Sequence, residues 1–286
     1  MARFKLTVAY DGTNFHGWQK QHPPGVVPLR TAQGVLEQAV RAVVRQPVNV
    51  FGASRTDSGV HAIGQVAAFD ADIPVPVERL AAAVTSRLPS DIQVVDAQIV
   101  SDAFNIIGDV ESKGYRYTVA FGRRDACTRP LFDRFWTAWT AWPLNVALMQ
   151  HAAQDIVGCH DFAAFTRINQ TRESTIRAVH TCDVTLVEDG RLTIDVSGEG
   201  FLWNMVRIIT GTLVEIGAER RPADSIQATL QSLDRAKAGA TFPPEGLSLQ
   251  WIRYGEPGCG RQKQLARQRA GQSSGEQAER QSGDSL

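Results

Sequence analysis

The chain is organised around one polar segment, Ala53-Ser54-Arg55-Thr56-Asp57-Ser58-Gly59-Val60-His61-Ala62, which lies between strand-like runs at 48–54 and 61–69. A loop in that place is where scaffolds commonly hold functional groups. Thr-Asp-Ser-Gly is also an ordinary turn, in which Asp and Ser bond the backbone and Gly takes a positive φ. Asp57 can act as a nucleophile or base only if a partner keeps it ionised and oriented. A plain turn and a catalytic loop are therefore both open.

Strands and helices are expected in mixed order on both sides of this loop. Alternating apolar residues predict a strand at 4–10, and Thr31 can cap a helix that runs to about Arg45. Further strands are expected at 92–100, 114–121, 175–187, 192–197 and 247–254, and further helices at 76–88, 144–157, 205–216 and 222–233. This order lacks the strict alternation of a doubly wound sheet. The expected class is α+β, with a mostly antiparallel sheet, helices on one face and two similar halves.

The pattern places a boundary near residue 105. The N-terminal half, residues 1–105, carries the Asp57 loop, and the C-terminal half, residues 106–256, carries an apolar helix with Arg207. Beyond residue 256 the composition changes to Gln, Arg, Ser and Gly, with almost no large apolar side chains. Such a segment cannot bury enough surface to offset its ordering entropy. Residues 257–286 are therefore expected to form a disordered tail.

Bulk composition narrows the class of protein. The 286 residues are 43% hydrophobic and 21% charged, as in ordinary globular proteins. No apolar run reaches the roughly 18 residues of a membrane span, and the first residues do not look like a signal peptide, so a cytoplasmic protein is expected. The 30 basic and 30 acidic residues argue against binding nucleic acid through bulk charge, but not against a local basic cleft. The cysteines have no metal-ligand spacing and are expected to be free thiols: Cys127, Cys159, Cys182 and Cys259.

Two further segments carry chemistry. Arg207 lies in the apolar stretch 205–209, and a charge there is costly unless it reaches solvent or is paired. The more specific interpretation is that Arg207 forms an ion pair with a carboxylate in a cleft, for which Asp57 is the obvious candidate. In Lys113-Gly114-Tyr115-Arg116-Tyr117, strand alternation puts Tyr115 and Tyr117 on one face. An exposed tyrosine there could stack on a nucleobase, and a buried core tyrosine is the alternative.

Together these segments resemble the A-type tRNA pseudouridine synthases. The similar motifs are Tyr10-Asp11-Gly12-Thr13-Asn14-Phe15-His16-Gly17-Trp18-Gln19-Lys20-Gln21, the catalytic motif at 55–62, Tyr115, Gly158-Cys159-His160-Asp161-Phe162, residues 200–213, and Gly246-Leu247 with the last strand. The resemblance runs from about residue 3 to residue 254.

The resemblance implies the pseudouridine synthase fold, with two α+β halves joined around a central cleft. It implies a homodimer that grips tRNA with both subunits and isomerises uridines of the anticodon stem-loop, at tRNA positions 38 to 40. It also implies that neither a metal nor an organic cofactor is needed.

The resemblance also assigns roles to individual residues. Asp57 is the implied catalytic aspartate, which either attacks C1′ of the uridine or removes the C2′ proton to give a glycal. Arg207 is implied to hold that carboxylate, and Arg55 to fill the gap left when the nucleotide flips out. Tyr115 is implied to stack on the flipped uracil and to help proton transfer at C5, and Leu247 to pack against the base.

Some positions depart from the family pattern. Ser54 and Ser58 stand where glycine and alanine are usual, Ile107 replaces a basic residue expected to touch RNA, and 241–247 is a loose version of its motif. A pseudouridine synthase with a different RNA target is therefore the main alternative. A catalytically silent tRNA-binding chaperone is a second. An aspartate-dependent hydrolase or phosphotransferase is a third, which a magnesium requirement would reveal.

Overall fold

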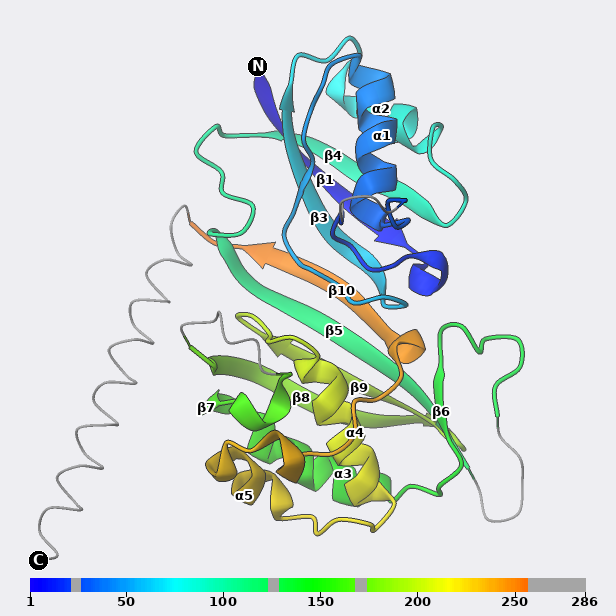
Figure 1. Ribbon diagram of the computed structural model, residues 1–286, viewed down its shortest axis with the longest axis vertical. Coiled ribbons are helices and arrows are strands. Elements are labelled where there is room, and N and C mark those ends of the chain that lie inside the picture. Colours follow the sequence, from blue (N-terminus) through cyan, green and yellow to red (C-terminus); the bar gives the residue numbers. More distant parts are fainter. Residues whose placement is uncertain (22–26, 123–128, 168–173, 257–286) are drawn as a thin grey trace, which may run out of the picture.

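The computed structural model describes residues 1–21, 27–122, 129–167 and 174–256. In these residues a single mixed sheet of ten strands runs through the molecule (Figure 1). Its strands are β1 (Ala2–Tyr10), β2 (Phe51–Gly52), β3 (His61–Ala71), β4 (Ile92–Val100), β5 (Val110–Phe121), β6 (Ala138–Thr140), β7 (Gly158–Asp161), β8 (Ile176–Glu188), β9 (Arg191–Gly198) and β10 (Leu247–Tyr254).

The order of the main strands is β4-β1-β3-β10-β5-β9-β8-β7, with β2 beside β3 and β6 beside β5. Most pairs are antiparallel, and the expected α+β class is confirmed. The last strand, β10, lies in the middle of the sheet, parallel to β3 and antiparallel to β5 (Figure 1). Because β3 follows directly after the Asp57 loop, this insertion brings the C-terminal segment next to that loop.

Helices lie beside both ends of the sheet (Figure 1). Helices α1 (Ala32–Val44) and α2 (Val77–Thr85) accompany the N-terminal strands, and α3 (Val146–Ala153), α4 (Met205–Gly217) and α5 (Ser225–Ser232) accompany β7, β8 and β9. Thr31 caps α1 as expected, since its hydroxyl accepts the Gly34 amide at 3.3 Å. Helix α4 is buried over most of its length, which explains why its sequence is apolar almost all round.

The strand expected at 48–54 is only two residues long. Side chains of α1 bind its backbone groups instead of a neighbouring strand: Gln33 Nε2 and Arg41 Nε donate to the carbonyls of Val50 and Val48, and Glu37 accepts the Val50 amide. These three side chains are four residues apart and share one helix face. The apolar pattern of 48–54 therefore reflects burial against α1 rather than a long strand.

Other expected elements differ in extent. The helix expected at 144–157 is α3 followed by a 3-10 turn, η2 (Gln154–Ile156), and α2 ends at Thr85 rather than at residue 88. Strands β6 and β7 were not expected, because three or four residues give no readable alternation. The strands β4 and β10 match their expected bounds. The proposed boundary near residue 105 falls in the connection from β4 to β5, while the sheet continues across it.

The sequence also gave predictions for the cysteines and for the C-terminal tail. Cys159 and Cys182 are free thiols, as expected, and burial raises the pKa of the Cys182 thiol to about 12. Cys127, Cys259 and the predicted tail at 257–286 lie outside the described residues. Among the residues that are described, no helix is long and apolar enough to cross a membrane.

Candidate active site

The Asp57 loop is held in place by main-chain contacts. The Thr56 carbonyl accepts the Trp18 amide at 3.1 Å, and the Asp57 carbonyl accepts the Val60 amide at 3.2 Å. Gly59 turns the chain with a φ of +79°, as the turn interpretation required. The Thr56 side chain is buried and shares a hydrogen bond of 2.8 Å with the Tyr10 hydroxyl. These contacts hold the backbone on both sides of Asp57.

The opening motif at residues 10–21 packs directly against this loop. A Cβ atom on Gly12 would lie 2.1 Å from the Val60 carbonyl oxygen, and one on Gly17 would lie 2.6 Å from the Thr56 carbonyl oxygen. Real Cβ atoms do not come this close, so both positions require glycine. The conspicuous sequence of this motif is therefore explained by close backbone packing beneath the Asp57 loop.

His61 joins three of the quoted motifs. Its Nδ1 accepts the Gly12 amide at 2.9 Å, and its Nε2 lies 3.2 Å from the Glu245 carbonyl oxygen. Nδ1 also lies 3.2 Å from Asp11 Oδ1 in the opening motif. The side chain is buried, and it links the opening motif, the end of the Asp57 loop and the start of β10. His61 thus fixes the relative position of segments that are far apart in the sequence.

The predicted ion pair is present. Arg207 Nη1 lies 3.3 Å from Asp57 Oδ2, although the two residues are 150 positions apart. Two further acceptors orient the guanidinium: Nη1 donates to Asn204 Oδ1 at 2.9 Å, and Nε donates to the Phe242 carbonyl at 2.9 Å. The side chains of Asp57 and Arg207 remain 26% and 17% exposed, so a substrate can reach the carboxylate.

Trp203 is a neighbour that sequence reasoning missed. Its indole Nε1 donates to Asp57 Oδ1 at 3.1 Å, while Arg207 binds the other carboxylate oxygen. The indole is 46% exposed and therefore lies at the surface of the site. Nothing in the local sequence marks Trp203, but Asn204 could have been found, because it precedes Arg207 by three residues at the start of a helix.

Tyr115 lies beneath the site in a buried position, with its side chain 7% exposed. Its hydroxyl shares a 3.0 Å hydrogen bond with Ser54 Oγ, which also accepts Lys113 Nζ at 3.2 Å, and its ring packs edge-on against Phe201 at 5.3 Å. Burial, together with the negative charge of Asp57, raises the pKa of Tyr115 to about 12. The phenol is therefore protonated at neutral pH. The alternation of Tyr115 and Tyr117 is confirmed, and both are buried.

The other expected site residues fall in different environments. Arg55 is exposed, next to the buried Thr56. Leu247 is only 4% exposed and pairs with Tyr117 across β10 and β5, so its contact with a base stays a prediction. Ile107 is 67% exposed in the turn between β4 and β5, as expected for a residue that replaces a surface charge.

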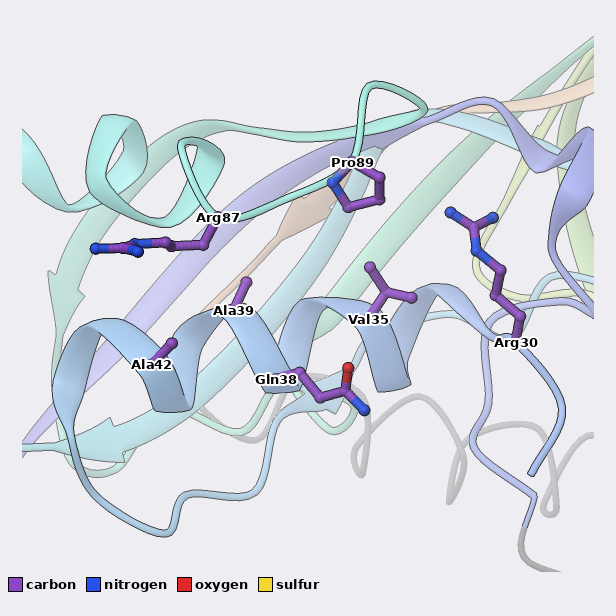
Figure 2. Close-up of a pocket in the computed structure, with 7 residues that line it drawn as sticks. All are labelled: Arg30, Val35, Gln38, Ala39, Ala42, Arg87 and Pro89. Carbon is purple, nitrogen blue, oxygen red and sulfur yellow. The ribbon is translucent and has the colours of Figure 1, made fainter. Parts of the chain in front are cut away.

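A separate hollow is lined by residues of the N-terminal half, and Asp57 is not among them. It measures about 440 Å³ and is bounded by α1 and the segment after α2 (Figure 2). Its lining consists of Arg30, Val35, Gln38, Ala39, Ala42, Arg87 and Pro89, and it contains no acid or nucleophile. Arg30 is already paired with Asp91 at 2.9 Å. This hollow therefore does not compete with the Asp57 site. In the described ranges, no group of three His, Cys, Asp or Glu side chains could hold a metal ion.

Known proteins are similar to this chain over most of its length. The family model described as tRNA pseudouridine synthase matches residues 6–106 and 152–255. The chain belongs to the tRNA pseudouridine synthase family. Members of this family are isomerases, so the chain is an enzyme of that class. The two matched segments contain Asp57 and Arg207, respectively, whereas Tyr115 lies between them.

Several similar proteins carry the name tRNA pseudouridine synthase A. One from Thermoanaerobacter sp. (strain X514) is 41% identical over 254 residues, which cover 89% of this chain and 100% of the relative. Another, from Limosilactobacillus fermentum, is 41% identical over 263 residues, 90% of this chain and 98% of the relative. A third, from Geotalea uraniireducens, is 40% identical over 255 residues. The resemblance to the A-type pseudouridine synthases is confirmed.

Proposed function

We propose that this pseudouridine synthase isomerises uridine to pseudouridine in tRNA, at positions 38 to 40 of the anticodon stem-loop, with Asp57 as the catalytic carboxylate. One observation carries the proposal. The Asp57 carboxylate is fixed by donors on both oxygens and is still open to solvent. The names of the relatives support tRNA as the substrate. The position within tRNA rests on the resemblance of the motifs.

The reaction breaks the N1–C1′ bond, turns the uracil and joins C5 to C1′, after which the C5 proton is lost. Asp57 either forms a bond to C1′ while N1 leaves, or removes the C2′ proton while N1 leaves to give a glycal, and returns the proton to C2′ when C5 joins C1′. Each carboxylate oxygen has two lone pairs, and each accepts one hydrogen bond here, from Trp203 or Arg207. A lone pair on either oxygen is therefore left for the ribose, and both routes remain open.

Tyr115 is proposed to act near the uracil as a phenol. Because its pKa is raised to about 12, it can donate a hydrogen bond at neutral pH but is a poor base in its resting state. Its hydroxyl is held by Ser54 at the base of the Asp57 loop. Stacking of the Tyr115 ring on uracil stays part of the proposal, as does packing of Leu247 against the base. Arg55, exposed beside the loop, is proposed to occupy the place of the flipped nucleotide.

A homodimer acting in the cytoplasm belongs to the same proposal. The dimer rests on the family resemblance. It is supported by four exposed apolar side chains between β5 and β6, which a second copy could bury: Leu131, Phe132, Phe135 and Trp136. Sedimentation of the purified chain should give twice its mass of 31.3 kDa. A monomer at micromolar concentration would remove the dimer from the proposal.

Pseudouridine mapping on an unmodified tRNA transcript tests the function. The purified protein, without added metal, should form pseudouridine at positions 38 to 40, and Asp57→Ala should form none at an expected loss of at least ~10³-fold. Asp57→Ala should still bind tRNA. Pseudouridine at other positions would keep the chemistry and reject the anticodon target. Binding without any pseudouridine from the wild type would favour the silent chaperone instead.

A further inference from the structure

Two arginines of the C-terminal half lie near the reaction centre and have no carboxylate partner among the described residues. Arg167 follows the 3-10 turn η3 (Ala163–Phe165), and Arg235 begins the 3-10 turn η4 (Arg235–Lys237). The two turns pack against each other. Sequence reasoning singled out neither residue, because both stand in ordinary polar surroundings in the sequence.

Arg167 is connected to Asp57 through one indole ring. Its guanidinium lies 5.8 Å from the centre of the Trp203 ring, on an indole that donates to Asp57. The Arg167 amide and the Thr166 hydroxyl both donate to the Trp203 carbonyl, at 3.4 and 3.0 Å. The backbone of 166–167 is therefore fixed to Trp203, and the exposed Arg167 side chain and the Asp57 carboxylate contact the same indole.

Arg235 points its guanidinium at neutral oxygens. Nη1 donates to the Ala238 carbonyl and Nη2 donates to the Thr241 hydroxyl, both at 3.3 Å. Thr241 precedes Phe242, whose carbonyl holds Arg207. Burial lowers the pKa of Arg235, and the neighbouring positive charge of Arg167 lowers it further. This agrees with the packing of the turns η3 and η4, which brings the two arginines into the same region.

Neighbouring carboxylates are already engaged by other groups: Asp234 Oδ1 accepts the Ala236 amide at 2.9 Å. Glu215 attracts Arg235, but its Oε2 is held by Arg221 at 3.0 and 3.1 Å and its Oε1 accepts the Ala240 amide. Within the described residues, neither Arg167 nor Arg235 makes an ion pair with an acid. Adjacent cations of this kind are unfavourable in the free protein and are relieved when an anion binds.

We propose that Arg167 and Arg235 together bind a phosphodiester of the RNA next to the reacting nucleotide. The proposal rests on the proposed function, because it supplies the anion from the same substrate. A nucleotide whose C1′ lies at Asp57 carries its flanking phosphates close to that carboxylate, and Arg167 contacts the same Trp203 indole that binds Asp57. Guanidinium groups suit the task, since their planar N–H groups match two phosphate oxygens at once.

Steady-state kinetics on a tRNA transcript test the proposal. Arg167→Ala should raise KM about five- to tenfold with little change in kcat, because the contact is made equally in the ground and transition states. The slope of log KM against log salt concentration should fall by roughly one. Arg235→Gln should act in the same direction. Since Arg235 is partly buried, Arg235→Lys is the second variant, and it should keep most of the salt dependence.

Arg220→Ala is the matched control. Arg220 is also an exposed arginine stacked on a half-exposed tryptophan, with its guanidinium 4.6 Å from the Trp142 ring centre. It lies beyond the other end of α4, whose last residue, Gly217, is about 15 Å along the helix from Arg207 at 1.5 Å per residue. Its replacement should leave KM and the salt slope unchanged.

Three results would overturn the phosphate site. The first is an equal rise of KM in Arg220→Ala, which would indicate that the loss of any exposed positive charge weakens RNA binding. The second is a fall in kcat at constant KM and salt slope, which would indicate action through Trp203. The third is wild-type kinetics in both Arg167→Ala and Arg235→Gln. Failure of the proposed function is seen separately, as absence of pseudouridine from the wild-type reaction.

Discussion

The loop at 53–61 and the segment at 201–207 present the two charges of the site, but they are held in different ways. The loop is fixed by main-chain hydrogen bonds and by glycines packed against its carbonyls. The segment at 201–207 is fixed largely by side chains: Asn204 and the Phe242 carbonyl orient Arg207, and Trp203 reaches across to Asp57. Asn204 itself takes a positive φ of 60°, which asparagine tolerates better than most residues.

The two regions therefore contribute to the site in different ways. The loop gives Asp57 one fixed place, while the Arg207 side supplies donors to a carboxylate that is already positioned. Substitutions of the residues that hold the loop should therefore damage folding together with activity. Substitutions on the Arg207 side should damage activity more than folding.

The largest effect on the Arg207 side is expected from Arg207→Ala. It leaves the carboxylate without its charged donor, and turnover should fall at least ~100-fold, equivalent to roughly 3 kcal/mol. Single-turnover kinetics on tRNA measure this, with tRNA binding as the control for intact folding. Arg207→Lys should recover part of the loss, because the charge is kept and the planar fork is not. Near-normal rates in Arg207→Ala would show that the ion pair has no part in catalysis.

On the loop side, Gly12→Ala is expected to lower the free energy of unfolding by about 2–4 kcal/mol, since the new methyl group would collide with the Val60 carbonyl. Chemical denaturation measures the loss, and activity should fall with it. Gly200→Ala is the matched control on the other side, because a Cβ there meets nothing within 4 Å. Equal stability of the two variants would contradict the difference between the regions.

Trp203→Phe should have a smaller effect. It keeps an aromatic ring under Arg167 but removes the N–H that binds Asp57, at a cost of about 1 kcal/mol. We expect kcat to fall roughly fivefold with stability almost unchanged. Trp142→Phe is the control, since Trp142 is comparably exposed and also carries a stacked arginine. If a fall in thermal stability accounted for the lost rate, the role of Trp203 would be structural rather than catalytic.

The smallest effect concerns alkaline pH. Burial raises the pKa of all four tyrosines, Tyr115 to about 12, whereas an unfolded tyrosine titrates near 10. Above pH 10 the unfolded state therefore loses protons that the folded state keeps, and stability should fall as the pH rises toward 12. Denaturant titrations at pH 8, 10 and 11 measure this, and Tyr115→Phe should weaken the dependence. Phenolate absorbance from the folded protein at pH 10 would contradict the raised pKa values of the tyrosines.

Much of the fold followed from local pattern. Thr31 at the start of α1, the apolar run of α4 and the turn at Gly190 each reflect forces that act within a few residues, so the sequence predicted them. The strand at 48–54 was overestimated, because its partners are side chains of α1 that no local pattern reveals. Strands as short as β6 and β7 exist only because a longer neighbour offers them hydrogen bonds.

The candidate site could likewise be predicted only in part from the sequence. Residue type and motif were enough to single out Asp57, Arg207 and Tyr115, since an aspartate in a turn and a charge in an apolar helix are visible in the chain alone. The contacts of Trp203 with Asp57, of His61 with Gly12, and of Arg167 with Trp203 join segments up to 146 residues apart. The contact of Trp203 with Asp57 joins the two halves of the sheet, which meet where β10 lies between β3 and β5, and long-range hydrogen bonding rather than local propensity sets that placement. Chemistry of single residues can be read from a sequence, but distances between them arise only when the sheet assembles.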